Sequence, residues 1–124
     1  MAANAAAPSR SVVLCIDDEP VALMVRMQVL QTAGFRVLGA ADFASAMKIF
    51  ESEPVDLVVT DHLLRQESGT QLAAQMKALK PSVPVVVLSG LPDPPEGIEV
   101  ADLFLTKGES PQHLISKLSE LLRH

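Results

Sequence analysis

Three acids, one hydroxyl and one ammonium come just after apolar segments of the chain. Ionised carboxylates that lie side by side raise one another's pKa unless a cation compensates their charge. Mg²⁺ compensates such charges, and proteins usually hold it with one or two carboxylates together with phosphate oxygens. These residue types therefore indicate magnesium-assisted phosphoryl chemistry, provided that the fold brings them together. The five residues are Asp17, Asp18, Asp61, Ser89 and Lys107.

Asp61 is the candidate nucleophile, because one oxygen of a carboxylate beside Mg²⁺ stays free to attack a phosphoryl group. Lys107 would pair with a phosphoryl oxygen, and the Ser89 hydroxyl would bond another. Taken singly, these residues also have ordinary explanations: Asp18 or Glu19 caps the following helix, Asp61 is a loop acid, Ser89 belongs to a turn, and Lys107 is a solvated charge. Those explanations do not account for the position of all these residues at the ends of predicted strands.

Five short segments predict the strands that position these side chains. Most are nearly continuous apolar runs, which is typical of a parallel sheet covered on both faces. The second is more polar, as an edge strand would be. The predicted strands are Val12–Ile16, Phe35–Ala40, Val55–Thr60, Val83–Leu88 and Asp102–Thr106.

Segments with helical spacing of apolar residues alternate with the strands. The first helix is predicted from Pro20 to Ala33, before a glycine at the position that favours a helix end. Its inner stripe consists of Leu23, Met27 and Leu30, widened by Val21, Met24 and Val25. The second helix is predicted over Phe43–Glu51, with Asp42 as its N-cap. The third begins at Ser68 or Gly69 and ends before Pro81. The last is predicted over Pro111–Leu122, with Ser110 as its N-cap.

This alternation predicts an α/β fold with a doubly wound, five-stranded parallel sheet of order 2-1-3-4-5 and helices on both faces. In such a sheet, ligands bind beyond the carboxyl ends of the strands. One connection is atypical, because the segment Gly90–Asp102 contains three prolines. The helix between strands four and five is therefore expected to be a short turn around Glu96–Val100 or to be absent.

Length and composition favour one domain in a reducing compartment. The chain has 124 residues, 48% of them hydrophobic, and its net charge of −5 argues against a nucleic-acid-binding surface. Its one cysteine, Cys15, lies in an apolar run and cannot form an intrachain disulfide. We expect no membrane span, a cytoplasmic location, and a disordered leader of residues 1–10 before a domain of residues 11–124.

The combination of motifs resembles the receiver domains of two-component response regulators. The motifs are "DDE" after the first strand, "VVTDHLLRQESG" with its acid at Asp61 and a glycine at Gly69, "VVVLSG" with Ser89, and "LFLTKG" with Lys107. The similarity extends from about Val12 to Leu122 and implies a flavodoxin-like fold.

The resemblance also implies a role for each site residue. Asp61 would be the phosphoacceptor, and Ser89 would be the switch hydroxyl. Phe104 falls on the aromatic switch position, whose ring turns inward as the hydroxyl moves toward the phosphoryl group. The implied Mg²⁺ ligands are Asp18, Asp61 and the main-chain carbonyl of Leu63, with Asp17 acting largely through water.

The implied function is a phosphorylation switch that catalyses only its own phosphorylation and dephosphorylation. The phosphoryl donor would be a sensor histidine kinase or a phosphotransfer protein. Because no output domain follows Arg123, we expect signalling by protein contact to a downstream effector, or a fused output domain in a longer regulator. A homodimer is a further expected assembly, and no direct contact with nucleic acid or membrane is expected. One departure from the family is Gly108, which stands where a proline usually follows the lysine.

Two apolar residues should tune the lifetime of the phosphorylated state. Leu63 and Leu91 lie two positions beyond Asp61 and Ser89. By family geometry they flank the path of the attacking water, and neither side chain can orient a water molecule. We therefore predict slow self-dephosphorylation.

Two other functions fit the sequence less well. A phosphatase of the haloacid-dehalogenase type would carry a DxDx[TV] motif after the first strand, and "DDEPV" does not fit that motif. A degenerate receiver would act as an unphosphorylated binding module, and the intact acids, Ser89 and Lys107 argue against it. The phosphorylation switch is the leading hypothesis.

Overall fold

The computed structural model describes residues 10–64, 68–91, 93–95 and 97–123. Residues 1–9 of the expected leader lie outside this range, as does Glu96 of the expected short turn. No helix in the described part of the chain is long and apolar enough to cross a membrane.

The sheet has the predicted topology. All five strands are parallel and follow the order β3-β2-β4-β5-β6, which is the order 2-1-3-4-5 counted along the chain. The more polar second strand lies at an edge, as expected. In chain order the strands are β2 (Val12–Ile16), β3 (Arg36–Ala40), β4 (Leu57–Asp61), β5 (Val85–Ser89) and β6 (Leu103–Thr106).

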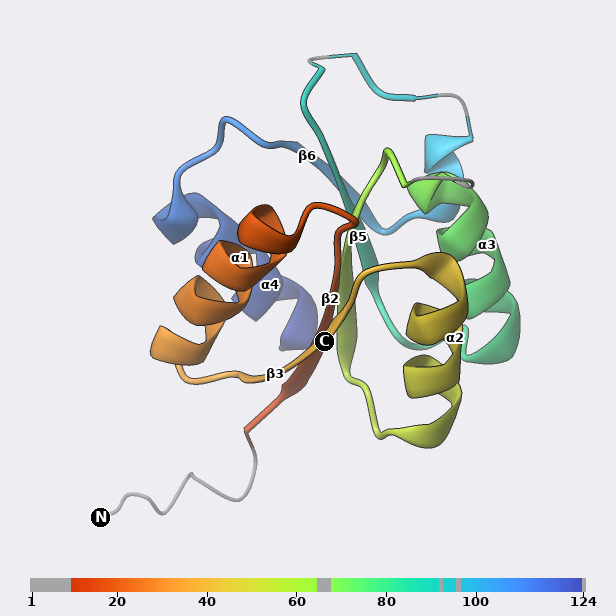
Figure 1. The fold of residues 1–124 in the computed structure, drawn as a ribbon, viewed down its shortest axis with the longest axis horizontal. Helices are drawn as coiled ribbons and strands as arrows, with labels where there is room; N and C mark the ends of the chain where they lie inside the picture. Colours follow the sequence, from red (N-terminus) through yellow and green to blue (C-terminus); the bar gives the residue numbers. More distant parts are fainter. Residues whose placement is uncertain (1–9, 65–67, 92, 96, 124) are drawn as a thin grey trace.

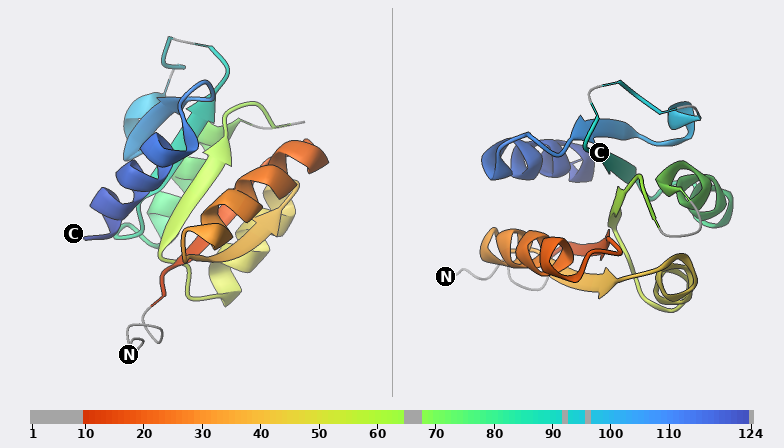
Figure 2. Two further views of the ribbon diagram at one scale, coloured as in Figure 1. Left: turned by 90° about the vertical axis from the view of Figure 1, so that its left-hand side faces the viewer. Right: turned by 45° about the horizontal axis from the view of Figure 1, so that its top comes forward.

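Helices cover both faces of the sheet (Figures 1 and 2). The first and last helices lie on one face over a core cluster that includes Leu57, Val86 and Leu118, and the other two lie on the opposite face over a cluster that includes Phe50 and Met76. The doubly wound prediction is therefore confirmed. The helices are α1 (Pro20–Thr32), α2 (Phe43–Ser52), α3 (Gly69–Leu79) and α4 (Pro111–Leu122).

In the described residues of the crossover between β5 and β6 (residues 90, 91, 93–95 and 97–102), the helical structure is one 3₁₀ turn, η2 (Ile98–Val100). The prolines of this segment remove the amide donors and restrict the backbone that a regular helix would need. The prediction of a short turn in place of a fourth full helix is thus confirmed. Asp102 closes the crossover, because its Oδ2 accepts hydrogen bonds from the Val85 N–H (2.7 Å) and from Lys77 Nζ (2.9 Å).

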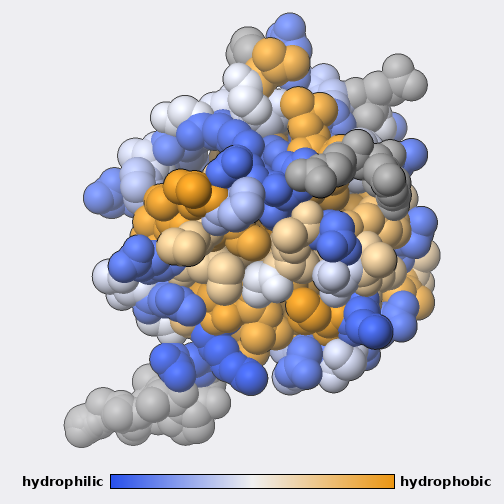
Figure 3. Space-filling model, in the orientation of Figure 1, coloured by the Kyte–Doolittle hydropathy of each residue, from blue (hydrophilic) through white to orange (hydrophobic). Residues whose placement is uncertain are grey.

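Helix α1 contacts the sheet along a narrower face than predicted. Leu30 of the inner stripe is fully buried, whereas Val21, Met24 and Val25 are 67%, 66% and 55% exposed. The prediction that these three residues widen the buried stripe is wrong, because they lie on the side of the helix that faces solvent. Figure 3 shows apolar atoms at the surface in the place that α1 occupies in Figure 1.

Candidate functional site

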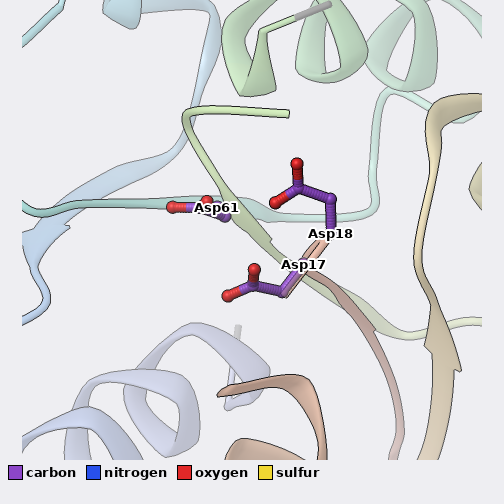
Figure 4. Close-up of side chains that lie close together, drawn as sticks. All are labelled: Asp17, Asp18 and Asp61. Atoms are coloured by element: carbon purple, nitrogen blue, oxygen red, sulfur yellow. The ribbon is translucent and has the colours of Figure 1, made fainter. Parts of the chain in front are cut away.

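Three carboxylates meet at the carboxyl ends of β2 and β4. Asp17 directly follows β2, Asp18 comes next, and Asp61 is the last residue of β4. One carboxylate oxygen from each lies within 4.8 Å of the others. All three carboxylates extend to the same side of the neighbouring strand ends (Figure 4). Asp17 and Asp61 are buried, and Asp18 is partly exposed.

Local backbone contacts fix the orientation of Asp17. Its Oδ1 accepts a hydrogen bond from the Glu19 N–H at 2.9 Å. Glu19 in turn is the N-cap of α1, and its side chain accepts from the Val21 N–H at 2.9 Å. The turn after β2 therefore begins α1 and directs Asp17 into the site at the same time.

Two cations balance part of the negative charge. Lys107 Nζ lies 2.9 Å from Asp61 Oδ1 and 3.7 Å from Asp17 Oδ2. Arg26 Nη1, from α1, lies 3.2 Å from Asp17 Oδ2. Each of the two buried acids thus has its own close cation.

Burial and the neighbouring cations shift the pKa of Asp61 in opposite directions. Burial raises the pKa of Asp61 above its ordinary value, and the charge of Asp17 adds to that rise. The hydrogen bond and charge of Lys107 oppose the rise, with a smaller contribution from Arg26. The ionised form of Asp61 is therefore held in place by its cation and not by solvent.

The hydroxyl and the lysine are joined through the backbone. The Lys107 N–H donates to the Ser89 carbonyl at 2.7 Å, which continues the pairing of β6 with β5. Ser89 is the last residue of β5, and its Oγ accepts from the Leu91 N–H at 3.1 Å. The sheet therefore holds Ser89 and Lys107 at the same edge as the three acids.

The remaining predicted residues surround this centre. Leu63 follows β4 and Leu91 follows β5, and both side chains are 66% exposed. Phe104 lies in β6, where it pairs with Val87 and is partly buried. Leu63 also forms an isolated antiparallel bridge with Ser68, which brings its backbone close to the start of α3.

The donor set suits a hard divalent cation. Three carboxylates whose oxygens lie within 4.8 Å of one another provide the ligand type that Mg²⁺ requires. Asp17 and Asp61 are too buried for solvent to compensate their charges fully, so a cation between them would lower the electrostatic free energy. The residues present therefore fit the ion.

Arg26 is the site residue that the sequence analysis did not identify. It lies three positions after Leu23 and four before Leu30, so it belongs to the inner stripe of α1. A charged residue at an inward-facing helical position needs a buried partner. That spacing was the available signal, and Asp17 is the partner.

Comparison with known proteins agrees with this geometry. The model of the response regulator receiver domain matches residues 13–119. Among curated relatives, the phosphate regulon transcriptional regulatory protein PhoB of Pseudomonas aeruginosa is 31% identical over 118 residues, which cover 90% of this chain and 51% of that protein. The alkaline phosphatase synthesis transcriptional regulatory protein PhoP of Bacillus subtilis is 30% identical, with 90% and 48% covered. The chain thus spans about half the length of these relatives.

Solved structures show the same fold. A CheY-like response regulator receiver domain protein from Methanospirillum hungatei superposes with a TM-score of 0.86 at 26% identity, covering 93% of this chain and 95% of the other. The response regulator protein TrrA of Thermotoga maritima, solved in complex with Mg(2+)-BeF, gives 0.84 at 25% identity, with 90% and 98% covered. Since the family model covers most of the chain and the fold and strand order agree, the chain belongs to the family of response regulator receiver domains.

Proposed function

We propose that the chain is a magnesium-dependent phosphorylation switch whose phosphoacceptor is Asp61. The observation that carries this proposal is the position of the buried Asp61 carboxylate. Its Oδ1 lies 2.9 Å from Lys107 Nζ, and it forms a cluster with the carboxylates of Asp17 and Asp18. An anion that is held by a cation and only weakly solvated is well placed to act as a nucleophile.

The transfer itself asks mainly for positioning and charge compensation. An oxygen of Asp61 forms the new bond to phosphorus while the bond from phosphorus to the donor's histidine nitrogen breaks. The nitrogen keeps the electron pair and takes up a proton. In the unphosphorylated chain Lys107 contacts the Asp61 carboxylate. Phosphorylation removes the negative charge of that carboxylate, so Lys107 then pairs with a phosphoryl oxygen.

Mg²⁺ would be held by Asp18, Asp61 and the carbonyl of Leu63, with Asp17 acting largely through water. When bound, the ion neutralises charge that develops on the transferred group. The three carboxylates lie close enough together to support this assignment. The Mg(2+)-BeF complex of the Thermotoga maritima relative is consistent with it.

The switch is proposed to involve Ser89 and Phe104. The Ser89 Oγ accepts from the Leu91 N–H, so its own proton is available for donation to a phosphoryl oxygen. A movement of Ser89 toward Asp61 would pull on the segment that begins with Leu91. Thr106 of β6 pairs with Ser89, and Phe104 lies two positions before it in the same strand. The ring of Phe104 would then turn toward the space that the hydroxyl leaves.

The proposed donor is a sensor histidine kinase or a phosphotransfer protein in the cytoplasm. The protein proposed to recognise the phosphorylated state is a downstream effector or a fused output domain. Residues 11–124 are proposed to form the receiver domain. The relatives are named as transcriptional regulators, so the output proposed for a longer protein is control of transcription. With a net charge of −5, this chain is proposed to contact protein and not nucleic acid.

Labelling with a small phosphodonor tests the proposal. In the presence of Mg²⁺, wild type should form an acid-stable, hydroxylamine-sensitive acyl phosphate, and Asp61→Asn should form none. Asp56→Asn removes the acid that directly precedes β4, at the end opposite to Asp61, and should label like wild type. Equal labelling of Asp61→Asn and wild type, or no labelling of wild type, would overturn the proposal in favour of an unphosphorylated binding module.

A further inference from the structure

Arg26 places a positive charge against the most deeply buried acid of the site. Its Nη1 lies 3.2 Å from Asp17 Oδ2, and the exposed fractions of the two side chains are 12% and 0%. Removing one partner of a buried ion pair leaves the other charge uncompensated. Arg26 therefore belongs to the charge balance of the acidic site.

The number of charges in the site makes Arg26 a competitor of a metal ion. Asp17, Asp18 and Asp61 bring three negative charges, and Arg26 and Lys107 bring two positive ones. The cluster thus has one excess negative charge, and a divalent cation would reverse the sign of that excess. One of the two protein cations then becomes surplus and is repelled.

Arg26 has room to leave Asp17. A cavity of about 410 Å³ lies between α1, α4 and the end of β6, and Arg26 and Lys107 both line it. Its other walls include the apolar side chains of Leu88, Leu105 and Leu114. The long Arg26 side chain can swing along this wall and expose its charged end to water while its stem stays packed.

We propose that Arg26 is a positioning residue that competes with Mg²⁺ for Asp17, lowering the metal affinity and stabilising the metal-free fold. The inference deepens the proposed function and rests on it. It assigns to this chain an internal cation that pairs with Asp17 when the metal, which Asp17 would contact largely through water, is absent. Metal binding is then an exchange of cations and not the filling of a bare acidic site.

Calorimetric titration with MgCl₂ measures the predicted effect without any phosphoryl transfer. The neutral variants Arg26→Met and Arg26→Gln should bind Mg²⁺ on the order of tenfold more tightly than wild type, a change of about 1.4 kcal/mol. Arg26→Lys keeps the charge and should bind with nearly the wild-type Kd. Gln retains hydrogen-bonding capacity toward Asp17, so it reports on charge even if the methionine variant folds poorly.

Thermal unfolding gives a second readout that a merely structural role would not produce. Both neutral variants should have a lower Tm than wild type without Mg²⁺, and saturating Mg²⁺ should raise their Tm by more than it raises that of wild type. Arg36→Met is the matched control, because it makes the same charge change at the exposed first residue of β3, at the other end of the sheet. Its Kd and its Mg²⁺-induced rise in Tm should equal those of wild type.

The outcomes separate the inference from the proposed function. If wild type and the neutral variants bind Mg²⁺ with the same Kd, Arg26 does not compete and the inference is overturned while the proposed function stands. If Arg36→Met tightens binding as much as Arg26→Met, the effect is one of net charge and the inference is again overturned. Absence of Mg²⁺ binding to wild type would overturn the proposed function, and the inference with it.

Discussion

Gly69 lies so close to Asp61 that a Cβ atom added to it would be 2.6 Å from the Asp61 carbonyl oxygen. The same atom would be 3.0 Å from the Cα of His62, and the Gly69 N–H donates to the His62 carbonyl at 2.7 Å. The start of α3 therefore rests directly on the end of β4. The glycine eight residues after Asp61 is explained by this backbone contact.

Replacement of Gly69 by alanine should shift the backbone that carries Asp61. Because both clashing partners are backbone atoms, the strain cannot be relieved by a side-chain rotation, and we expect a loss of about 1–3 kcal/mol in the free energy of unfolding. Urea denaturation measures the loss, and phosphodonor labelling should slow in the same variant. Gly108→Ala is the control, since a Cβ there meets no atom within 4 Å. Equal losses in the two variants would contradict the explanation.

The positions of most site residues follow from the sequence because of one property of parallel sheets. The carboxyl ends of all strands lie at one edge, so residues that follow apolar runs must meet there. This places Asp17, Asp61, Ser89 and Lys107 together without knowledge of any side-chain contact. The sequence predicts the ends of the strands less exactly. Strands β4 and β5 each extend one residue beyond their predicted ends, so they include Asp61 and Ser89.

The contribution of α1 could not be predicted in the same way. An apolar stripe indicates a buried face, but it does not tell how wide that face is. That width depends on how α1 and α4 share one side of the sheet, so the apolar pattern predicts Val21, Met24 and Val25 inside although they are exposed. Arg26 cannot be assigned to the site from the sequence, because a single charge within the stripe identifies no partner until the distance to Asp17 is known.

Asp56 and Asp102 each make two hydrogen bonds to the backbone of a residue at the start of a strand. Replacing either aspartate should destabilise the fold. Asp56 Oδ2 accepts from the Val12 N–H at 2.8 Å while the Asp56 N–H donates to the Val12 carbonyl at 2.8 Å. Asp102 makes the same pair of bonds with Val85, at 2.7 Å and 2.8 Å. Alanine at either position leaves a partly buried amide without its acceptor, which costs about 1–3 kcal/mol.

Chemical denaturation of the four single variants tests this pairing. Asp56→Asn and Asp102→Asn keep a side-chain acceptor oxygen and should lose much less stability than the alanine variants. If asparagine and alanine destabilise equally, charge and not hydrogen bonding is responsible. Asp102 would then act mainly through its ion pair with Lys77.

Cys15 should make stability depend on pH in the alkaline range. Burial raises the pKa of the Cys15 thiol from 9.0 to about 12. Below pH 9 the thiol is neutral in both states, whereas between pH 9 and 12 only the unfolded state releases the proton. Stability is therefore lost as pH rises through this window, by up to about 1.4 kcal/mol per pH unit.

A comparison of wild type with Cys15→Ala isolates this effect from other titrating groups. The difference in unfolding free energy between the two proteins should change by about 1 kcal/mol between pH 9 and pH 10, in favour of the variant. A difference that stays constant over this range would show that the thiol ionises equally in both states. The folded protein should also resist alkylation at pH 8, because Cys15 has no exposed surface.

Leu63 and Leu91 should give the phosphorylated state a long lifetime. Both side chains are 66% exposed beside the site, and neither can accept or donate a hydrogen bond to the water that attacks phosphorus. Leu63→Asn supplies such a group and should shorten the half-life of the acyl phosphate at least a few-fold. Leu79→Asn replaces a 51% exposed leucine at the far end of α3 and should leave the half-life unchanged. A half-life of Leu63→Asn equal to or longer than that of wild type would show that water access is set elsewhere in the site.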